Sequence, residues 1–172
     1  MTTLARIRDS DEYRSIAAHY GVRTARRSAV PLIRHIDDGL IVLDRLAANT
    51  ATMRAFCLHP LIQADADLVA QLPNLDALDT TPSIVALALE YRHVANAALS
   101  TREFVDATAI ALSPVAEVNT MLVADKVQNR VDFLRYHRAT HPRSAALDRY
   151  FRLWLERLGV DEARYIELAA GL

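Results

Sequence analysis

The stretch Asn119-Thr-Met-Leu-Val-Ala-Asp-Lys-Val-Gln-Asn-Arg130 combines helical periodicity with polar residues on the face that should be buried. Apolar residues recur at three- and four-residue steps, which predicts a helix from about Pro114 to about Arg138. The same apolar stripe passes through Asp125 and Asn129. Burying a carboxylate and an amide without partners costs several kcal/mol. The two side chains therefore need a hydrogen-bond network, a metal ion or a polar ligand.

The composition favours one compact all-helical domain of 172 residues. The chain is 52% hydrophobic and has only four glycines. A net charge of −1 gives no electrostatic reason to expect nucleic-acid or membrane partners. The single cysteine, Cys57, excludes an internal disulfide, and its apolar surroundings predict a buried, inert thiol. The N-terminus lacks the apolar segment of a signal peptide, so we expect a cytoplasmic protein. Whether it forms a homo-oligomer stays open.

Capping and breaking residues divide the chain into seven or eight helices. The expected helices run from about Asp11 to Tyr20, Pro31 to Ala48, Asn49 or Thr50 to His59, Thr81 to Ser100, Pro114 to Arg138 and Ala145 to Leu158, with a short final helix after Asp161. The acidic region between Asp65 and Asp79 is predicted to be partly loop. The region that carries the candidate functional motifs covers about 23–138, and the helices within 144–170 should pack on it.

Three polar residues on three separate predicted helices are candidate metal ligands. His35 lies one turn into its helix, His59 ends an apolar segment, and Asp125 lies on a buried helix face. Two imidazoles and a carboxylate suit a divalent ion such as Mn, Fe or Zn. No local motif of the HExxH type fixes their geometry. The alternative is that each histidine is a hydrogen-bonded residue of the core.

Three segments resemble motifs of one known family. The segment from Arg26 to His35, RRSAVPLIRH, resembles the "hRKSGEPYiiHP" that opens the hydrolase domain of the RelA/SpoT family. AFCLH, ending at His59, is similar to the family's "AALLHD". LVADKVQN, ending at Asn129, is similar to "vkLADrlhN". The three motifs occur in the family's order and together cover most of the chain.

The resemblance implies a fold, an activity and residue roles. The fold would be the all-helical HD-domain fold, and the activity would be manganese-dependent removal of the 3′-pyrophosphate from (p)ppGpp. The synthetase domain of the family would be absent. The metal ligands would be His35, His59 and Asp125. The ligand pocket would use residues of the first and third motifs: Arg26, Arg27, Ser28, Asn129 and Arg130.

The sequence departs from the family at the expected catalytic centre. Pro60 replaces the aspartate that follows the motif histidine, so one anionic metal ligand is missing. Gln63 and Ala64 stand where the family has a Glu–Asp pair, and a glutamine can hold a water but cannot act as a base. Losing a group that supports a metal site typically costs about 10- to 100-fold in metal affinity or activity.

Several other residues could replace the missing groups. Asp65 and Asp67 could turn inward, or they could lie in a solvated acidic loop. Glu90 and His93 share one helix face and could line the same pocket as an acid/base pair, or they could form a wet surface. The polar residues from Arg130 to Arg143 could bind phosphate, although surface ion pairs would explain them equally well.

These observations support three hypotheses about function. The first is a divergent HD-type hydrolase that acts on a phosphorylated small molecule and uses Mn, Fe or Zn. In the second, the pocket is kept, the metal is lost, and the chain carries out changed chemistry on another small molecule with His35, His59, His93 or Glu90 as acid/base groups. The catalytic candidates overall are Gln63, Glu90 and His93. The third is a non-catalytic protein that binds a nucleotide-like ligand. Metal content separates the first hypothesis from the other two.

Overall fold

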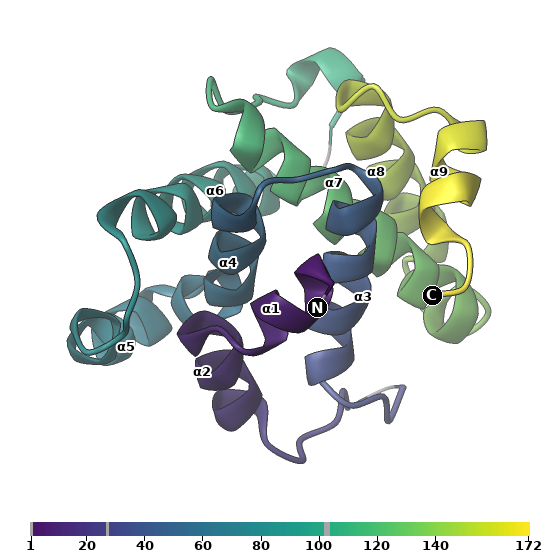
Figure 1. Ribbon diagram of the computed structural model, residues 1–172. Helices are drawn as coiled ribbons and strands as arrows, with labels where there is room; N and C mark the ends of the chain where they lie inside the picture. The colour runs from purple at the N-terminus through teal and green to yellow at the C-terminus, as the bar shows by residue number, and fades with distance from the viewer. Residues whose placement is uncertain (1, 27, 102–103) are drawn as a thin grey trace.

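Helix α7 (Ala116–Asp132) is the element against which most of the other helices pack. The computed structural model describes residues 2–26, 28–101 and 104–172, and these form an all-α domain without a β-strand. The helices in contact with α7 are α3 (Ile33–Arg45), α4 (Thr50–Leu58), α6 (Pro82–Thr101), α8 (Ser144–Arg157) and α9 (Glu162–Ala169). In Figure 1, α3 and α4 lie near the middle of the molecule, with α5 and α6 to one side and α8 and α9 to the other.

The remaining helices pack against α3, α4 and the turn that follows α4. Helices α1 (Thr3–Arg8) and α2 (Asp11–Tyr20) both contact α3 and α4. A short 3-10 turn, η1 (His59–Ile62), continues α4 and contacts α6 and α5 (Asp65–Asp76). Among the described residues, eight of the nine α-helices have seven or more residues, which confirms the predicted number. In the described part of the chain, we find no helix with the length and apolarity that crossing a membrane requires.

Local capping sets several helix starts where the sequence predicts them. The side chains of Ser10, Asn49 and Asp161 each accept a hydrogen bond from the backbone N–H three residues later, at 3.4, 2.9 and 2.7 Å respectively. These bonds satisfy N–H groups that have no partner inside the helix. The starts of α2, α4 and α9 therefore agree with the sequence analysis.

Other boundaries differ from the prediction. Helix α3 begins at Ile33, not Pro31, because Pro31 forms an isolated bridge with Thr24. It ends at Arg45, three residues before the predicted end, and Ala47 then takes a positive φ of 52°. The predicted long helix of about 114–138 begins at Ala116 and passes into a π-helical turn, η3 (Phe133–His137).

The acidic region predicted to be partly loop is helical over most of its length, and only the residues after Asp76 are irregular. The chain is helical from Asp65 to Asp76 even though Pro73 lies inside this helix. Asp65 and Asp67 occupy the first turn, where negative charge interacts favourably with the helix dipole. Both side chains are exposed, so neither of them turns inward.

The close approach of α3 and α4 depends on a residue without a side chain. A Cβ atom at Gly39 would overlap the ring of Phe56. Phe56 is fully buried, and its ring centroid lies 4.6 Å from that of His59 and 6.0 Å from that of His35. Gly39 therefore allows α3 and α4 to pack closely enough for the two histidines to meet.

Candidate metal centre

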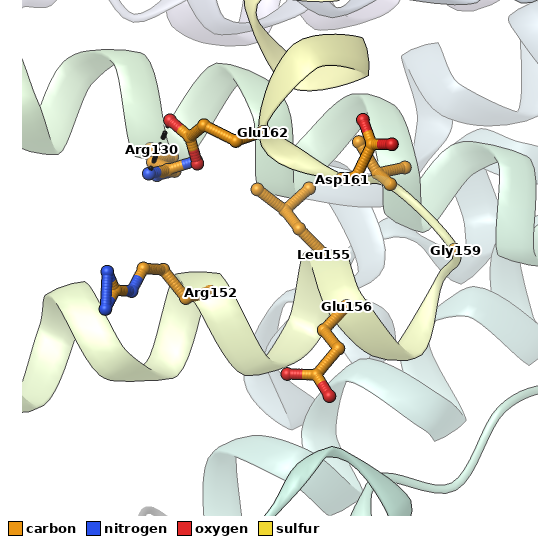
Figure 2. A pocket seen from close by; sticks show the side chains of 8 residues that line it. Arg130, Arg152, Leu155, Glu156, Gly159, Asp161 and Glu162 are labelled. Atoms are coloured by element: carbon orange, nitrogen blue, oxygen red, sulfur yellow. Dashed lines mark hydrogen bonds and ion pairs between the residues drawn. The ribbon is translucent and has the colours of Figure 1, made fainter.

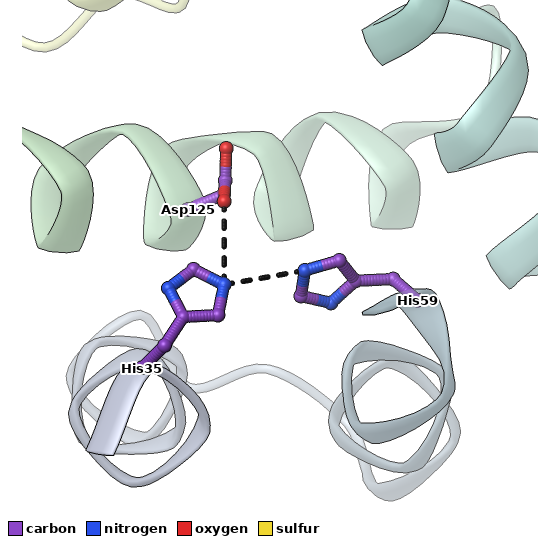
Figure 3. A group of neighbouring side chains, drawn as sticks. All are labelled: His35, His59 and Asp125. Atoms are coloured by element: carbon purple, nitrogen blue, oxygen red, sulfur yellow. Dashed lines mark hydrogen bonds and ion pairs between the residues drawn. The ribbon is translucent and has the colours of Figure 1, made fainter. Parts of the chain in front are cut away.

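The three predicted metal ligands come together between α3, the end of α4 and α7. Figure 3 shows α3 and α4 end-on, with His35 and His59 pointing toward one another and Asp125 reaching down from α7. One ligand atom from each residue lies within 4.8 Å of the other two. His35 Nε2 is 3.3 Å from His59 Nε2 and 3.5 Å from Asp125 Oδ1. Packing between helices, not a local motif, creates this cluster.

Hydrogen bonds on the far side of each ring fix the tautomers of the two histidines. His59 Nδ1 lies 2.6 Å from the backbone oxygen of Phe56, which can only accept, so Nδ1 carries the proton. His35 Nδ1 lies 2.6 Å from Gln128 Oε1. The Gln128 amide is oriented by its own Nε2, which donates to Asp132 Oδ2 at 2.8 Å, so its oxygen must face His35. Neutral His35 and His59 therefore point two Nε2 lone pairs at each other.

This arrangement requires a positively charged species between the rings. Two lone pairs and a carboxylate oxygen repel one another at these distances, and a shared proton or a metal ion removes the repulsion. Four tetrahedral ligands about 2.1 Å from a zinc ion would lie roughly 3.4 Å apart. The two separations that involve His35, 3.3 and 3.5 Å, are close to that value, and the ligand atoms of His59 and Asp125 lie further apart but within 4.8 Å. The donor atoms and their outer hydrogen bonds fit a divalent metal.

Asp125 already has three polar partners in addition to the histidines. Asn129 Nδ2 donates to its Oδ1 at 2.8 Å, and Lys126 Nζ donates to its Oδ2 at 2.7 Å. The Tyr91 hydroxyl on α6 also hydrogen-bonds to this carboxylate, and its ring centroid lies 4.7 Å from that of His59. The buried carboxylate and amide of α7 are therefore satisfied by a hydrogen-bond network.

Lys126 is the single lysine of the chain, and it is buried. Its ammonium nitrogen lies 5.1 Å from the Trp154 ring and 5.8 Å from the Tyr150 ring, and it also hydrogen-bonds to Tyr150. Burial acts to lower the pKa of Lys126, but the interactions with Asp125 and Tyr150 together outweigh it and raise that pKa. Lys126 is therefore a permanent positive charge against Asp125.

The electrostatics of the centre keep His59 neutral and Asp125 charged. Burial, followed by the charge of His35, lowers the pKa of His59 to about 3. Burial acts to raise the pKa of Asp125, but the charges of Lys126 and the two histidines together bring it below its usual value. A neutral imidazole and an ionised carboxylate are the forms that bind a metal ion.

The predicted replacement acid/base residues are not part of this cluster. Within the described residues, the group with metal-ligand geometry consists of His35, His59 and Asp125. Glu90 accepts a 2.7 Å hydrogen bond from Ser113 Oγ, just before α7 begins. His93 is exposed. The alternative interpretation, a wet helix face, describes His93, whereas Glu90 is partly buried and bonded to Ser113.

Gln63 is also held by another element. Its amide hydrogen-bonds to the side chain of Asn96 on α6, and Asn96 Nδ2 donates to the Gln63 backbone oxygen at 2.9 Å. These reciprocal bonds tie the chain after η1 to α6. The Gln63 amide therefore serves a structural contact, and placing a water on it would require this contact to open.

The predicted ligand pocket is only partly described. Arg26 is exposed in the connector between α2 and α3, and the Ser28 hydroxyl accepts a 3.4 Å bond from the Val30 N–H. The prediction for Arg27 lies outside the described residues. Asn129 contacts Asp125, so its amide lies at the centre.

Arg130 has a different role from the one expected. Its guanidinium donates two hydrogen bonds to the Glu162 carboxylate, at 2.8 and 3.1 Å, and stacks 4.1 Å from the Tyr165 ring centroid. Figure 2 shows this pair at the edge of a surface pocket between α7, α8 and α9, with Arg152 and Glu156 on its opposite side. Arg130 joins α9 to α7, and both of its terminal nitrogens are occupied by the Glu162 carboxylate.

Sequence reasoning missed three residues of the centre. Lys126 and Gln128 lie inside the α7 motif, and Tyr91 reads as an ordinary core residue on its helix. Two signals were available in the sequence: Lys126, the single lysine, lies next to Asp125, and Gln128 follows Asp125 by three residues. Cys57 is buried as predicted, and burial raises its pKa.

Comparisons with protein-family models, curated proteins and solved structures found no match to this chain. Its function must therefore be inferred from its own residues.

Proposed function

We propose that this chain is a divergent, metal-dependent phosphohydrolase of the HD type that acts on a phosphorylated small molecule. The observation that carries the proposal is the pair of Nε2 lone pairs of His35 and His59, which face each other 3.3 Å apart beside Asp125. The Nδ1–H groups of His35 and His59 donate to Gln128 Oε1 and the Phe56 carbonyl, and these bonds hold both rings in the tautomer that binds a metal. A histidine pair that served only the core would not need this alignment.

The choice of substrate class rests on the motifs. The segment from Arg26 to His35 resembles the RelA/SpoT hydrolase opening, and it places a basic connector directly before the helix that carries His35. His35 is also the most accessible ligand, since 22% of its side chain is exposed against 6% for Asp125. A phosphorylated ligand would therefore approach from the His35 side.

The residues present indicate which group would perform each part of the chemistry. A bound Mn, Fe or Zn ion would polarise a phosphoryl oxygen and lower the pKa of a water. Asn129 and Lys126 hold the Asp125 carboxylate in a fixed position, and Tyr91 encloses the buried side of the cluster. Pro60 stands where the family has an anionic metal ligand, and Gln63 and Ala64 stand where it has the carboxylates that activate water, so turnover should be slow.

A specific observation favours a second candidate, a metal-free pocket that binds a ligand or performs changed chemistry. Lys126 already neutralises Asp125, so the centre attracts a cation less strongly than an unpaired carboxylate would. In this case one imidazole would be protonated, and its Nε2–H would donate to the Nε2 atom of the other. The pocket would then bind its ligand without metal-dependent hydrolysis.

One experiment separates the two candidates. The protein is purified without chelator, its metal content is measured, and hydrolysis of pyrophosphorylated nucleotides is assayed with added Mn²⁺. The hydrolase proposal expects about one equivalent of metal, and both the metal and the activity should be lost in His59→Asn. Arg164→Gln, which alters an exposed ion pair on α9, serves as the control. A folded protein that takes up no metal supports the second candidate.

A further inference from the structure

The charge balance of the centre differs from that of an ordinary two-histidine, one-carboxylate metal site. Asp125 supplies one negative charge and Lys126 cancels it at 2.7 Å. Both side chains are more than nine-tenths buried. Asp132 lies one hydrogen bond further out, behind Gln128, and is half-buried. The Asp125–Lys126 pair therefore carries no net charge of its own.

A divalent ion would change this balance. With His35 and His59 neutral, the ion would leave two uncompensated positive charges among buried groups. Isolated charges in such surroundings cost several kcal/mol each unless a counter-charge accompanies them. The aromatic rings of Tyr150 and Trp154 hold Lys126 in place, so its ammonium cannot move into solvent to relieve the excess.

One side of the centre is partly open to solvent, since 22% of the His35 side chain is exposed. Besides the half-buried His35, Tyr20 lies close enough that the Asp125 charge contributes, after burial, to raising the pKa of Tyr20 to about 12. The Arg23 guanidinium lies 5.8 Å from the Tyr20 ring centroid. Arg23 is exposed, and its guanidinium donates to the backbone oxygens of His19 and Tyr20, so it is a cation beside Tyr20 that an incoming anion could meet.

We infer that Lys126 makes this centre bind a divalent metal and a phosphate-type anion as a cooperative pair, each strengthening the binding of the other. This inference rests on the proposed function, because it assumes that the metal binds at His35, His59 and Asp125. It adds to that proposal a requirement for charge balance. Lys126 neutralises the charge of Asp125, and a phosphoryl group supplies the negative charge that the metal ion then lacks. The metal-loaded site without an anion is then the disfavoured state.

The test measures Mn²⁺ affinity, with and without inorganic phosphate, from the electron paramagnetic resonance signal of the free ion. In the wild type, phosphate should tighten Mn²⁺ binding by about tenfold or more, a typical coupling between two sites. Lys126→Met should bind Mn²⁺ more tightly than the wild type when phosphate is absent, and phosphate should then have little effect. Lys126→Arg keeps the charge and should retain the coupling, and His59→Asn verifies that the signal reports this centre.

The outcomes distinguish this inference from the proposed function. Mn²⁺ that binds at the centre of the wild type with an affinity independent of phosphate would overturn the inference and leave the metal centre standing. No Mn²⁺ binding with or without phosphate would overturn both. If Lys126→Met does not fold, the effect of phosphate on the wild type is enough to support or overturn the cooperative pair.

Discussion

The centre between α3, α4 and α7 and the surface formed by α5 and α6 contain similar residues, but the structure uses them differently. At the centre, His35, His59 and Asp125 converge on one point. On the other side, Asp65 pairs with Arg92 at the surface and His93 is exposed. A polar residue on an apolar stripe is carried inward by the packing of its helix. A polar residue beside the stripe can instead reach water or a nearby partner.

The largest expected effect comes from a mutation that breaks the buried ion pair of the centre. Asp125→Ala leaves Lys126 buried without a counter-charge, which should lower the free energy of unfolding by about 3–5 kcal/mol. Urea denaturation followed by circular dichroism measures the loss. The matched variant on the other side, Asp65→Ala, removes a carboxylate whose side chain is 93% exposed, and its denaturation midpoint should stay near that of the wild type. Equal losses in the two variants would contradict the comparison.

Acidification should weaken the metal-free protein through His59. Burial lowers its pKa from 6.5 in the unfolded chain to about 3 in the fold. Between these values the unfolded state binds a proton that the folded state does not, so stability is complete above 6.5 and falls as the pH falls toward 3. This residue should contribute about 1.4 kcal/mol per pH unit.

The measurement is the free energy of unfolding with chelator present, at several pH values from neutral to mildly acidic. His59→Asn removes the titrating group and should flatten the profile in this window. The low pKa of Asp125 adds a further loss only near and below the usual range of a carboxyl group. A profile that His59→Asn leaves unchanged would show that His59 is not the group responsible.

A smaller effect should come from the outer hydrogen bond of His35. Gln128→Leu removes the acceptor that holds Nδ1–H, so the ring can rotate or change tautomer. Metal affinity should fall by about 10- to 100-fold while the fold persists. Isothermal titration with Zn²⁺ measures the change, and Gln128→Glu, which keeps an acceptor, should bind more tightly than Gln128→Leu. Equal metal affinities for the wild type and Gln128→Leu would show that Gln128 does not orient the His35 ring.

The smallest effects should come from the α6 candidates. Glu90→Gln keeps an acceptor for the Ser113 hydroxyl, and His93→Gln changes an exposed side chain. Neither variant should alter metal affinity or any hydrolysis rate by more than a small factor. A large loss of activity in either one, with the fold intact, would move the chemistry to the α6 face.

The sequence predicted those features that depend on local or periodic signals. Ser10, Asn49 and Asp161 cap helices where expected, because a side-chain oxygen and a nearby backbone N–H are enough to set such a start. The convergence of His35, His59 and Asp125 was also predicted, from their positions on helix faces and from the family resemblance.

Features that depend on tertiary partners were not predictable in the same way. The acidic stretch around Asp65 reads as loop-forming, yet its carboxylates favour the start of α5. Arg130 reads as a phosphate ligand, but it is paired with Glu162, which lies 32 residues away. Lys126 follows the proposed metal ligand, and only the packing of α8 against α7 shows that its ammonium is trapped beside Trp154.

Whether His35, His59 and Asp125 form one metal centre can be observed in a crystal of the protein soaked in Zn²⁺. Anomalous scattering at the zinc edge locates the ion independently of the protein density. We expect one strong peak about 2.0–2.2 Å from His35 Nε2, His59 Nε2 and Asp125 Oδ1. That peak should be absent in His59→Asn. A wild-type crystal with zinc only at surface residues, and with the two Nε2 atoms still in contact, would show that these residues do not form a metal centre.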